Sequence, residues 1–221
     1  MTISLSLQEF DEQFQESDKK ELHFDKSDKL DVAWQHKGRI GEGWRRHVQL
    51  RGEIFIQIDK VQHCDRLLVS EPEHEGFLGW HFFLSGQQQN IYSSFQKETC
   101  FSIDSGKHIL FSGGSNHKVT YDCSDIEPFL EVQVYAQPET LHSFVGDAVG
   151  ELPKVFHHLM GSSDRNCYKR LGETSPVVNA ILHQIIQCPY QGLTKRMYLE
   201  GKATELMGLM LEAEAAVQQG D

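Results

Sequence analysis

The chain of 221 residues lacks the features on which several classes of protein depend. No run of lysine or arginine exceeds two residues and the formal net charge is −11, so the chain repels phosphate backbones. No apolar run approaches the roughly 20 residues that a membrane-spanning helix needs. No secretory signal pattern precedes the cysteines. We expect a cytoplasmic protein that does not enter a membrane and does not itself bind nucleic acid.

Motifs of catalysis are missing as well. The five cysteines are widely spaced and form no CxxC, which favours reduced thiols in a reducing compartment over a disulfide framework. There is no GxSxG nucleophile elbow, and the lone GxG in "RIGEGWRR" is followed by a strand pattern rather than a helix, so it does not predict a phosphate site. These absences argue against an enzyme.

The 12 histidines do not have the spacing of a metal site. A metal-binding β-barrel of the cupin kind uses a His-x-His pair, because alternate residues of a strand point to the same side. His81 and His108 stand alone, and the adjacent His157 and His158 would point about a hundred degrees apart on a helix. We predict no metal ligands, and a cupin-type metalloenzyme is the alternative that stoichiometric metal would support.

What the chain does contain is a long series of short strand patterns. Glycine is frequent at 18 and proline sparse at 6, and "GWRRHVQLRGEIFIQID" reads as two strands joined by a turn at Arg51-Gly52. Similar runs follow at intervals of roughly 8 to 12 residues, the spacing of a sandwich or barrel. This pattern predicts a β-barrel or jelly roll, cupin-like, over residues 41–137. Residues 1–40 are expected to be a partly ordered lead-in with one short amphipathic helix.

The period changes to that of helices after Pro138. Ser175 is the expected N-cap of a helix with Pro176 in its first turn, and Cys188-Pro189 ends it. A closing helix from about residue 194 to 217 carries an apolar stripe. Residues 138–221 are therefore predicted to be a helical subdomain with a linker helix. The fold class is α+β, with an N-terminal β unit and C-terminal helices.

Large aromatic and basic residues on the predicted strands are the candidate ligand-binding residues. Alternation puts Trp44 and Arg46 on one face of a strand, and if that face points inward, the guanidinium requires an anionic ligand or a partner carboxylate. The alternative is that the aromatic residues fill the core while the arginines face water. The predicted ligand-binding set is Trp44, Arg46, Trp80, Phe82, Tyr92 and Tyr121.

The C-terminal third carries a motif that is similar to a known family. "SPVVNAILHQIIQCPYQGLTKRMYLEGKATELMGLML" combines a proline, an apolar helix, a Cys-Pro-Tyr-x-Gly stop and then Tyr-Leu-Glu-x-Lys-Ala-x-Glu-Leu. It resembles the segment before the DNA-binding domain in AraC-type transcription regulators of the pyochelin-regulator subgroup. "GWRRHVQLRGEIFIQI" and "WHFFLSG" also look like the β portion of that subgroup's sensor domain, so the resemblance covers most of residues 40–217.

The resemblance implies a ligand-sensing and dimerising domain that responds to a ferric siderophore or another iron-related molecule. Haem is the second candidate ligand, since Cys188-Pro189 matches a haem regulatory dipeptide. The resemblance also implies a homodimer formed through the helices. The apolar stripe of Leu199, Leu206 and Met210 is a candidate interface, and burial against the chain's own barrel is the commoner alternative for such a stripe. DNA would be bound by a helix-turn-helix domain that these 221 residues do not contain, so we expect either a piece that ends at the linker or a natural short protein.

Overall fold

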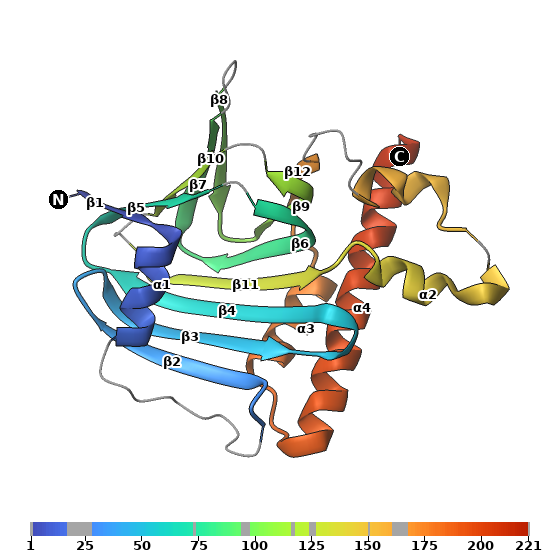
Figure 1. The fold of residues 1–221 in the computed structure, drawn as a ribbon, viewed down its shortest axis with the longest axis horizontal. Helices are drawn as coiled ribbons and strands as arrows, with labels where there is room; N and C mark the ends of the chain where they lie inside the picture. Colours follow the sequence, from blue (N-terminus) through green and yellow to red (C-terminus); the bar gives the residue numbers. More distant parts are fainter. Residues whose placement is uncertain are drawn as a thin grey trace.

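The computed structural model describes residues 2–16, 28–72, 74–93, 98–115, 118–123, 127–149, 151–160 and 168–220. Within these ranges two β-sheets face one another, and helices cover the outer face of the larger sheet (Figure 1). The elements in chain order are β1 (Thr2–Ser6), α1 (Leu7–Glu16), β2 (Asp31–Gly38), β3 (Gly41–Gln49), η1 (Arg51–Glu53), β4 (Ile54–His63), β5 (Arg66–Glu71), β6 (His74–Ser85), β7 (Gln87–Ser93), β8 (Glu98–Asp104), β9 (Lys107–Ser115), β10 (Lys118–Cys123), β11 (Phe129–Ala136), α2 (Thr140–Val149), η2 (Lys154–Met160), β12 (Tyr168–Glu173), α3 (Pro176–Ile186) and α4 (Gly192–Gln219).

The larger sheet has seven strands in the order β12-β9-β6-β11-β4-β3-β2. The predicted strand, turn and strand around Arg51-Gly52 is present as β3, η1 and β4, which pair in antiparallel register. Gly52 has φ of 65°, a left-handed conformation that costs glycine little and lets the chain reverse there.

The smaller sheet has five strands in the order β1-β5-β10-β7-β8. Its first strand, β1, lies parallel to β5, and the other pairs are antiparallel. No described strand of one sheet is hydrogen-bonded to a strand of the other, so the described part of the β unit is a jelly-roll-like sandwich rather than a closed barrel. The predicted α+β class with C-terminal helices is confirmed.

In the structure the β unit extends beyond the predicted bounds of residues 41–137 at both ends. Part of the predicted lead-in joins it, because β1 and β2 belong to the two sheets and α1 packs against β2. At the other end β12, in the predicted helical subdomain, pairs with β9. Periodicity did not reveal β1 and β12 because they have five and six residues, and β2 begins at the end of the charged segment DKSDKLD. Residues 17–27 of the lead-in lie outside the described residues.

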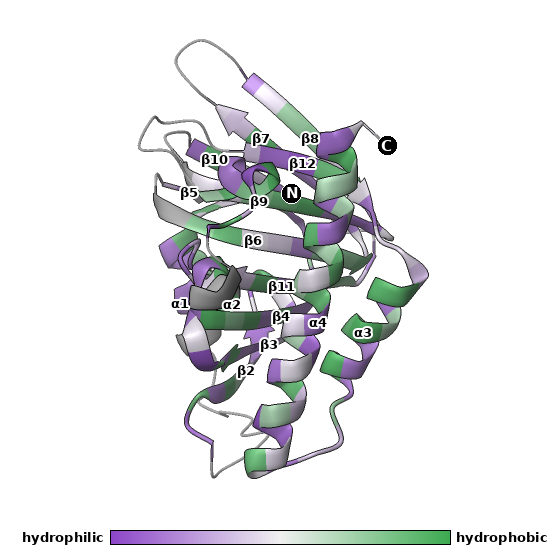
Figure 2. Ribbon diagram, turned by 90° about the vertical axis from the view of Figure 1, so that its right-hand side faces the viewer, coloured by the Kyte–Doolittle hydropathy of each residue, from purple (hydrophilic) through white to green (hydrophobic). Residues whose placement is uncertain are grey.

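Helix α3 begins at the predicted Pro176, and α4 extends a little beyond the predicted residues 194–217 at both ends. The Ser175 side chain accepts a hydrogen bond from the backbone N–H of Val178, which caps α3, and α4 extends from Gly192 to Gln219. Figure 2 shows α3 and α4 beside one another on the same side of the larger sheet. Among the described residues, no helix combines the length and the apolar character that crossing a membrane requires.

The main hydrophobic core lies between the larger sheet and these helices. Strand residues such as Ile56, Ile58 and Val134 pack there against Leu206 and Met210 of α4. Leu199, Leu206 and Met210 are each at most 2% exposed. Of the two alternatives for this stripe, a dimer interface or burial against the chain's own β unit, the structure shows the second, and burying the stripe there removes apolar area from water.

Helix α4 crosses the larger sheet from one edge strand to the other and is held by buried charges near both ends (Figure 1). Near its beginning, Lys195 Nζ lies 2.6 Å from Asp31 Oδ2 at the start of β2. Near its end, Glu214 Oε2 lies 2.5 Å from Arg170 Nε of β12. An ion pair this deep is costly to break on one side only, so these contacts fix the helix relative to the sheet.

Candidate functional site

A cavity of about 530 Å³ lies between the two sheets. Its volume is within the range of pockets that hold small organic ligands. The larger sheet contributes side chains of β3, β4, β6, β9, β11 and β12, and the smaller sheet contributes side chains of β5, β7 and β10. The lining residues are His47, Glu53, Phe55, Gln57, Glu71, Phe77, His81, Asn90, Tyr92, Ile109, Phe111, Gly113, Val119, Tyr121, Tyr135, Gln137 and Lys169.

Aromatic rings form one wall of the cavity. Phe111 and Tyr135 stand with ring centroids 5.9 Å apart, and His81 meets the Phe111 ring edge to face at 4.9 Å. The rings of Phe111 and Tyr135 fit side by side because the residue between them on β6 is Gly79, and a Cβ atom at that position would clash with both rings. Edge-to-face pairs of this kind leave ring faces available for a further aromatic group.

Hydrogen-bonded polar groups also line the cavity. Tyr121 donates a hydrogen bond to Glu71 of β5, and the Tyr135 hydroxyl lies 2.9 Å from His81 Nε2. Burial, reinforced by the charge of Glu71, raises the pKa of Tyr121 well above its ordinary value. Burial and the charge of Glu131 do the same for the pKa of Tyr135. Both phenols are therefore neutral, and because their O–H protons are donated to Glu71 and Gln133, each hydroxyl can accept a hydrogen bond from a ligand.

Lys169 is the only lysine or arginine among the residues that line this cavity. Its Nζ lies 3.4 Å from the centroid of the Tyr92 ring, a cation–π contact that links β12 to β7 across the two sheets. His47 also lines the cavity, and burial together with the nearby Arg45 lowers its pKa. Lys169 is thus the positive charge that an anionic ligand group would meet.

A smaller cavity of about 180 Å³ adjoins the first and is covered by α1. The two share Gln57, Glu71, His81, Tyr121 and Tyr135 as lining residues. Arg45, on the floor of the smaller cavity, is paired with Asp11 of α1 and with Asp59, whose Oδ1 lies 2.6 Å from its Nε. Burial opposes its charge, but these two carboxylates outweigh that effect and raise the pKa of Arg45, so the guanidinium stays charged beside them.

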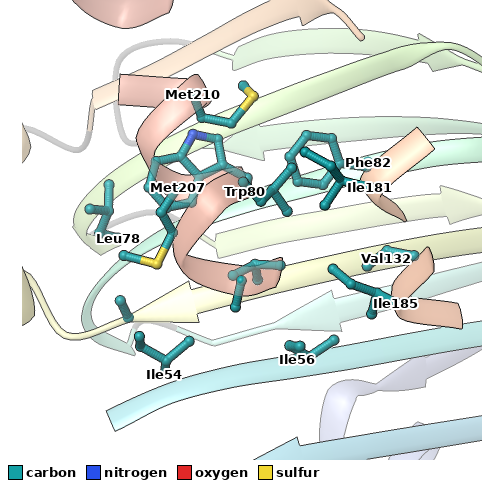
Figure 3. Close-up of a cluster of buried hydrophobic side chains, with 14 of the residues drawn as sticks. Ile54, Ile56, Leu78, Trp80, Phe82, Val132, Ile181, Ile185, Met207 and Met210 are labelled. Carbon is teal, nitrogen blue, oxygen red and sulfur yellow. The ribbon is translucent and has the colours of Figure 1, made fainter. Parts of the chain in front are cut away.

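The structure brings two of the six predicted ligand-binding residues to the cavity. Tyr92 and Tyr121 line it, whereas Trp44, Arg46, Trp80 and Phe82 lie on the other face of the larger sheet. Figure 3 shows Trp80 and Phe82 among Met207, Met210 and Ile181 of the helices.

Strand alternation explains why these four predicted residues do not line the cavity. Their face is the one that the helices cover, so the aromatic rings contribute to the core. Arg46 is neutralised there by the partner carboxylate that the sequence left open, with Nε and Nη2 donating to Asp31 at 2.8 and 2.7 Å. The geometry removes the need for an anionic ligand at Arg46.

The cavity residues that the sequence did not single out include Phe55, Phe111, Tyr135 and Lys169. One signal could have found two of them, Phe55 and Tyr135. In "IFIQID" and "LEVQVYA" the aliphatic residues share one parity while aromatic, amide and carboxyl side chains share the other. An amphipathic helix covers an aliphatic face, so the mixed face is the one expected to line a cavity. Lys169 has no such signal because β12 was not predicted.

The histidines and the cysteine considered as metal or haem ligands have different surroundings in the described structure. His81 lines the cavity, while His108 is buried and lines neither cavity. No group of three or more histidine, cysteine, aspartate or glutamate side chains that could hold a metal ion occurs among the described residues. Cys188, the candidate haem ligand, packs at the margin of the helix-covered core and lines neither cavity.

Comparison with known proteins identifies the family. Residues 40–221 match the N-terminal domain of the regulatory protein PchR. The chain belongs to this family of regulatory domains. No protein with a curated function matches the chain significantly.

The solved structures that resemble it are distant. Vicilin from Corylus avellana (hazelnut) is 15% identical over 47% of this chain and 31% of its own, with a TM-score of 0.35. A variant of oxalate decarboxylase from Bacillus subtilis is 11% identical over 64% of this chain and 40% of its own, with a TM-score of 0.34. The chain spans less than half the length of either protein, and similarities this weak carry no argument about function.

Proposed function

We propose that this regulatory domain is the sensor of an AraC-type transcription regulator and that the cavity between the sheets binds its effector, a ferric siderophore bearing aromatic rings. The observation that carries the proposal is the cavity of about 530 Å³, whose lining joins six phenylalanine and tyrosine rings to a single lysine. Membership of the PchR N-terminal family supports a regulatory role for the domain.

The lining suits an amphiphilic ligand. The faces of Phe111 and Tyr92 offer stacking surfaces for aryl rings, and burying such rings contributes most of the affinity of aromatic ligands. Lys169 offers a positive charge to a carboxylate or phenolate group. The neutral hydroxyls of Tyr121 and Tyr135 can bond to heteroatoms of the ligand, which would select its orientation.

The signal would be a shift between two arrangements of the sandwich and its helices. A ligand changes such a balance only by binding one arrangement more tightly than the other. Moving the ratio from 1:99 to 99:1 takes about 5.5 kcal/mol of discrimination. DNA would be contacted by a helix-turn-helix domain joined after α4, and the domain would pair with a second copy through its helices.

Isothermal titration calorimetry with the ferric complexes of a phenolate, a catecholate and a hydroxamate siderophore tests the ligand class. We expect at least one of the two aryl complexes to bind and the hydroxamate complex to bind at least about tenfold more weakly, because it lacks rings to stack. Lys169→Met and Tyr121→Phe should each weaken binding by roughly tenfold. Trp44→Phe, on the helix-covered face, is the control and should leave the affinity unchanged.

The same titration can reject the proposal. Absence of heat with all three complexes would remove the siderophore class. A Soret band on adding haem, with an affinity higher than that for any ferric siderophore, would replace it with a haem sensor. Equal losses of affinity in Trp44→Phe and Lys169→Met would remove the cavity as the binding site.

A further inference from the structure

Strand β12 separates the cavity from the end of α4. It lies at the edge of the larger sheet, where it pairs with β9. Successive residues of a strand point to opposite faces, so Lys169 faces the cavity while Tyr168 and Arg170 face the helices. One short strand therefore contacts both the site where we propose that ligand binds and the helix that would transmit the signal.

The contact on the cavity side depends on Lys169. Its ammonium group lies 3.4 Å from the centroid of Tyr92, which is 7% exposed and belongs to the smaller sheet. Its cross-strand neighbour on β9 is Phe111, another cavity residue. A ligand with an anionic group would compete with the Tyr92 ring for this lysine, so occupancy of the cavity acts directly on β12.

The contact on the helix side centres on Glu214 of α4, which is completely buried. Arg170 Nε donates to Oε2 at 2.5 Å, and Tyr168 Oη donates to Oε1 at 2.7 Å. His158 Nε2 lies 2.9 Å and Gln218 Nε2 lies 2.8 Å from Oε1. Two of these four partners therefore come from β12.

The charge of the buried Glu214 carboxylate is stabilised by its hydrogen-bond donors, so its stability depends on where those donors lie. Burial raises the pKa of Glu214, but the hydrogen bonds from Tyr168, Gln218 and Arg170 outweigh burial, so the pKa lies below its ordinary value and the group is charged at neutral pH. A buried carboxylate that loses its partners is strongly destabilised. The last turns of α4 must therefore either follow β12 or detach from it.

We propose that β12 couples the cavity to the last turns of α4, with Lys169 as the contact to the ligand and Tyr168 and Arg170 as the contacts to Glu214. The proposal rests on the proposed function, because it assigns the route by which that site acts. When a ligand draws Lys169 away from Tyr92, β12 shifts, the hydrogen bonds to Glu214 rearrange, and the end of α4 changes its position on the sheet.

Hydrogen exchange of the full chain, followed by mass spectrometry, tests the coupling without a ligand. Lys169→Met removes only the charge on the cavity side, and we expect exchange in residues 206–219 of α4 to change by at least roughly threefold. Lys118→Met is the matched control, since Lys118 is an exposed lysine at the start of β10, a strand that pairs with β5 and β7 rather than β12, and it lines neither cavity. Unchanged exchange in Lys169→Met, or equal changes in both variants, would overturn the coupling.

The second arm uses the ferric phenolate siderophore complex as probe. We expect it to change exchange of residues 206–219 in the natural chain but not in Glu214→Gln, whose calorimetric affinity should stay within about threefold because Glu214 lies outside the cavity. An equal exchange response in Glu214→Gln would overturn the route. If the complex does not bind the natural chain at all, the proposed function fails while the ligand-free arm still decides the coupling. Should Glu214→Gln not fold, Arg170→Lys takes its place, because it keeps the charge but loses the guanidinium geometry.

Discussion

Lys195 of α4 and Asp31 of β2 form an ion pair in which Nζ and Oδ2 are 2.6 Å apart and neither side chain is more than 3% exposed. Arg46 of β3 donates two further hydrogen bonds to the same carboxylate. Burial raises the pKa of Asp31, but Arg46 and Lys195 outweigh it and hold the pKa below its ordinary value. One carboxylate thus joins two strands of the larger sheet to the beginning of α4.

Asp31→Asn should remove the carboxylate charge that lies beside two buried cations, Arg46 and Lys195. We expect the free energy of unfolding in urea to fall by about 3 to 5 kcal/mol. Lys202→Met, which breaks the more exposed pair of Lys202 and Glu205 on the same helix, is the control and should cost less than about 1 kcal/mol. Equal losses of unfolding free energy in the two variants would contradict a special role for the buried Asp31 carboxylate.

The sequence predicted those parts of the fold that local chemistry decides. Ser175 and Pro176 mark the start of α3 because a side-chain oxygen caps the first turn, and Arg51-Gly52 marks the turn between β3 and β4 because glycine accepts a positive φ. The edge strand β12 was not predicted, because a six-residue strand with a lysine, an arginine, a glycine and a glutamate has no apolar period.

The site was predicted only in part, for a different physical reason. Period-2 alternation says that Trp44 and Arg46 share a face, but not whether that face meets the other sheet or the helices. Both faces of this sheet are buried, so burial alone does not distinguish them. Tyr92 and Tyr121 lie on the smaller sheet, and their inward side chains line the cavity.

Trp80→Leu tests which face of β6 packs against the helices. The indole is 1% exposed and packs against α4, so a smaller side chain should leave a void and lower the free energy of unfolding by about 3 kcal/mol. Affinity for the ferric phenolate complex should change by less than about twofold, because the residue does not touch the cavity. Calorimetry beside urea unfolding checks both values. A large loss of affinity with unchanged stability would show that the faces are reversed.

The proposed homodimer requires an apolar surface other than the buried stripe of α4. Leu193 and Met197, in the first turns of that helix, are 74% and 66% exposed. If this surface pairs with a second copy, Leu193→Glu should raise the dimer dissociation constant at least about tenfold, because the charge would be buried. Leu30→Glu, at a residue 43% exposed outside the helices, is the matched control. Sedimentation equilibrium decides, and identical masses for both variants would assign the interface elsewhere.

His108 should make the domain sensitive to mild acid. It is 4% exposed and packs between Phe82 and the strand residue Gly172, with Arg170 and Glu214 as the charged groups that act on it. Burial, followed by the charge of Arg170, lowers the pKa of His108 to about 4 against an ordinary value of 6.5, and Glu214 opposes this only partly.

A histidine whose pKa is lower in the folded state stays neutral there while the unfolded chain takes up a proton. Its contribution to stability is therefore complete above pH 6.5 and is lost as pH falls toward 4. Between pH 7 and pH 5 this amounts to about 2 kcal/mol. His108→Leu should remove that part of the pH dependence from urea unfolding measured at the two values. Equal slopes in the variant and the natural chain would mean that His108 is protonated in the folded state and that its ring is not shielded from water.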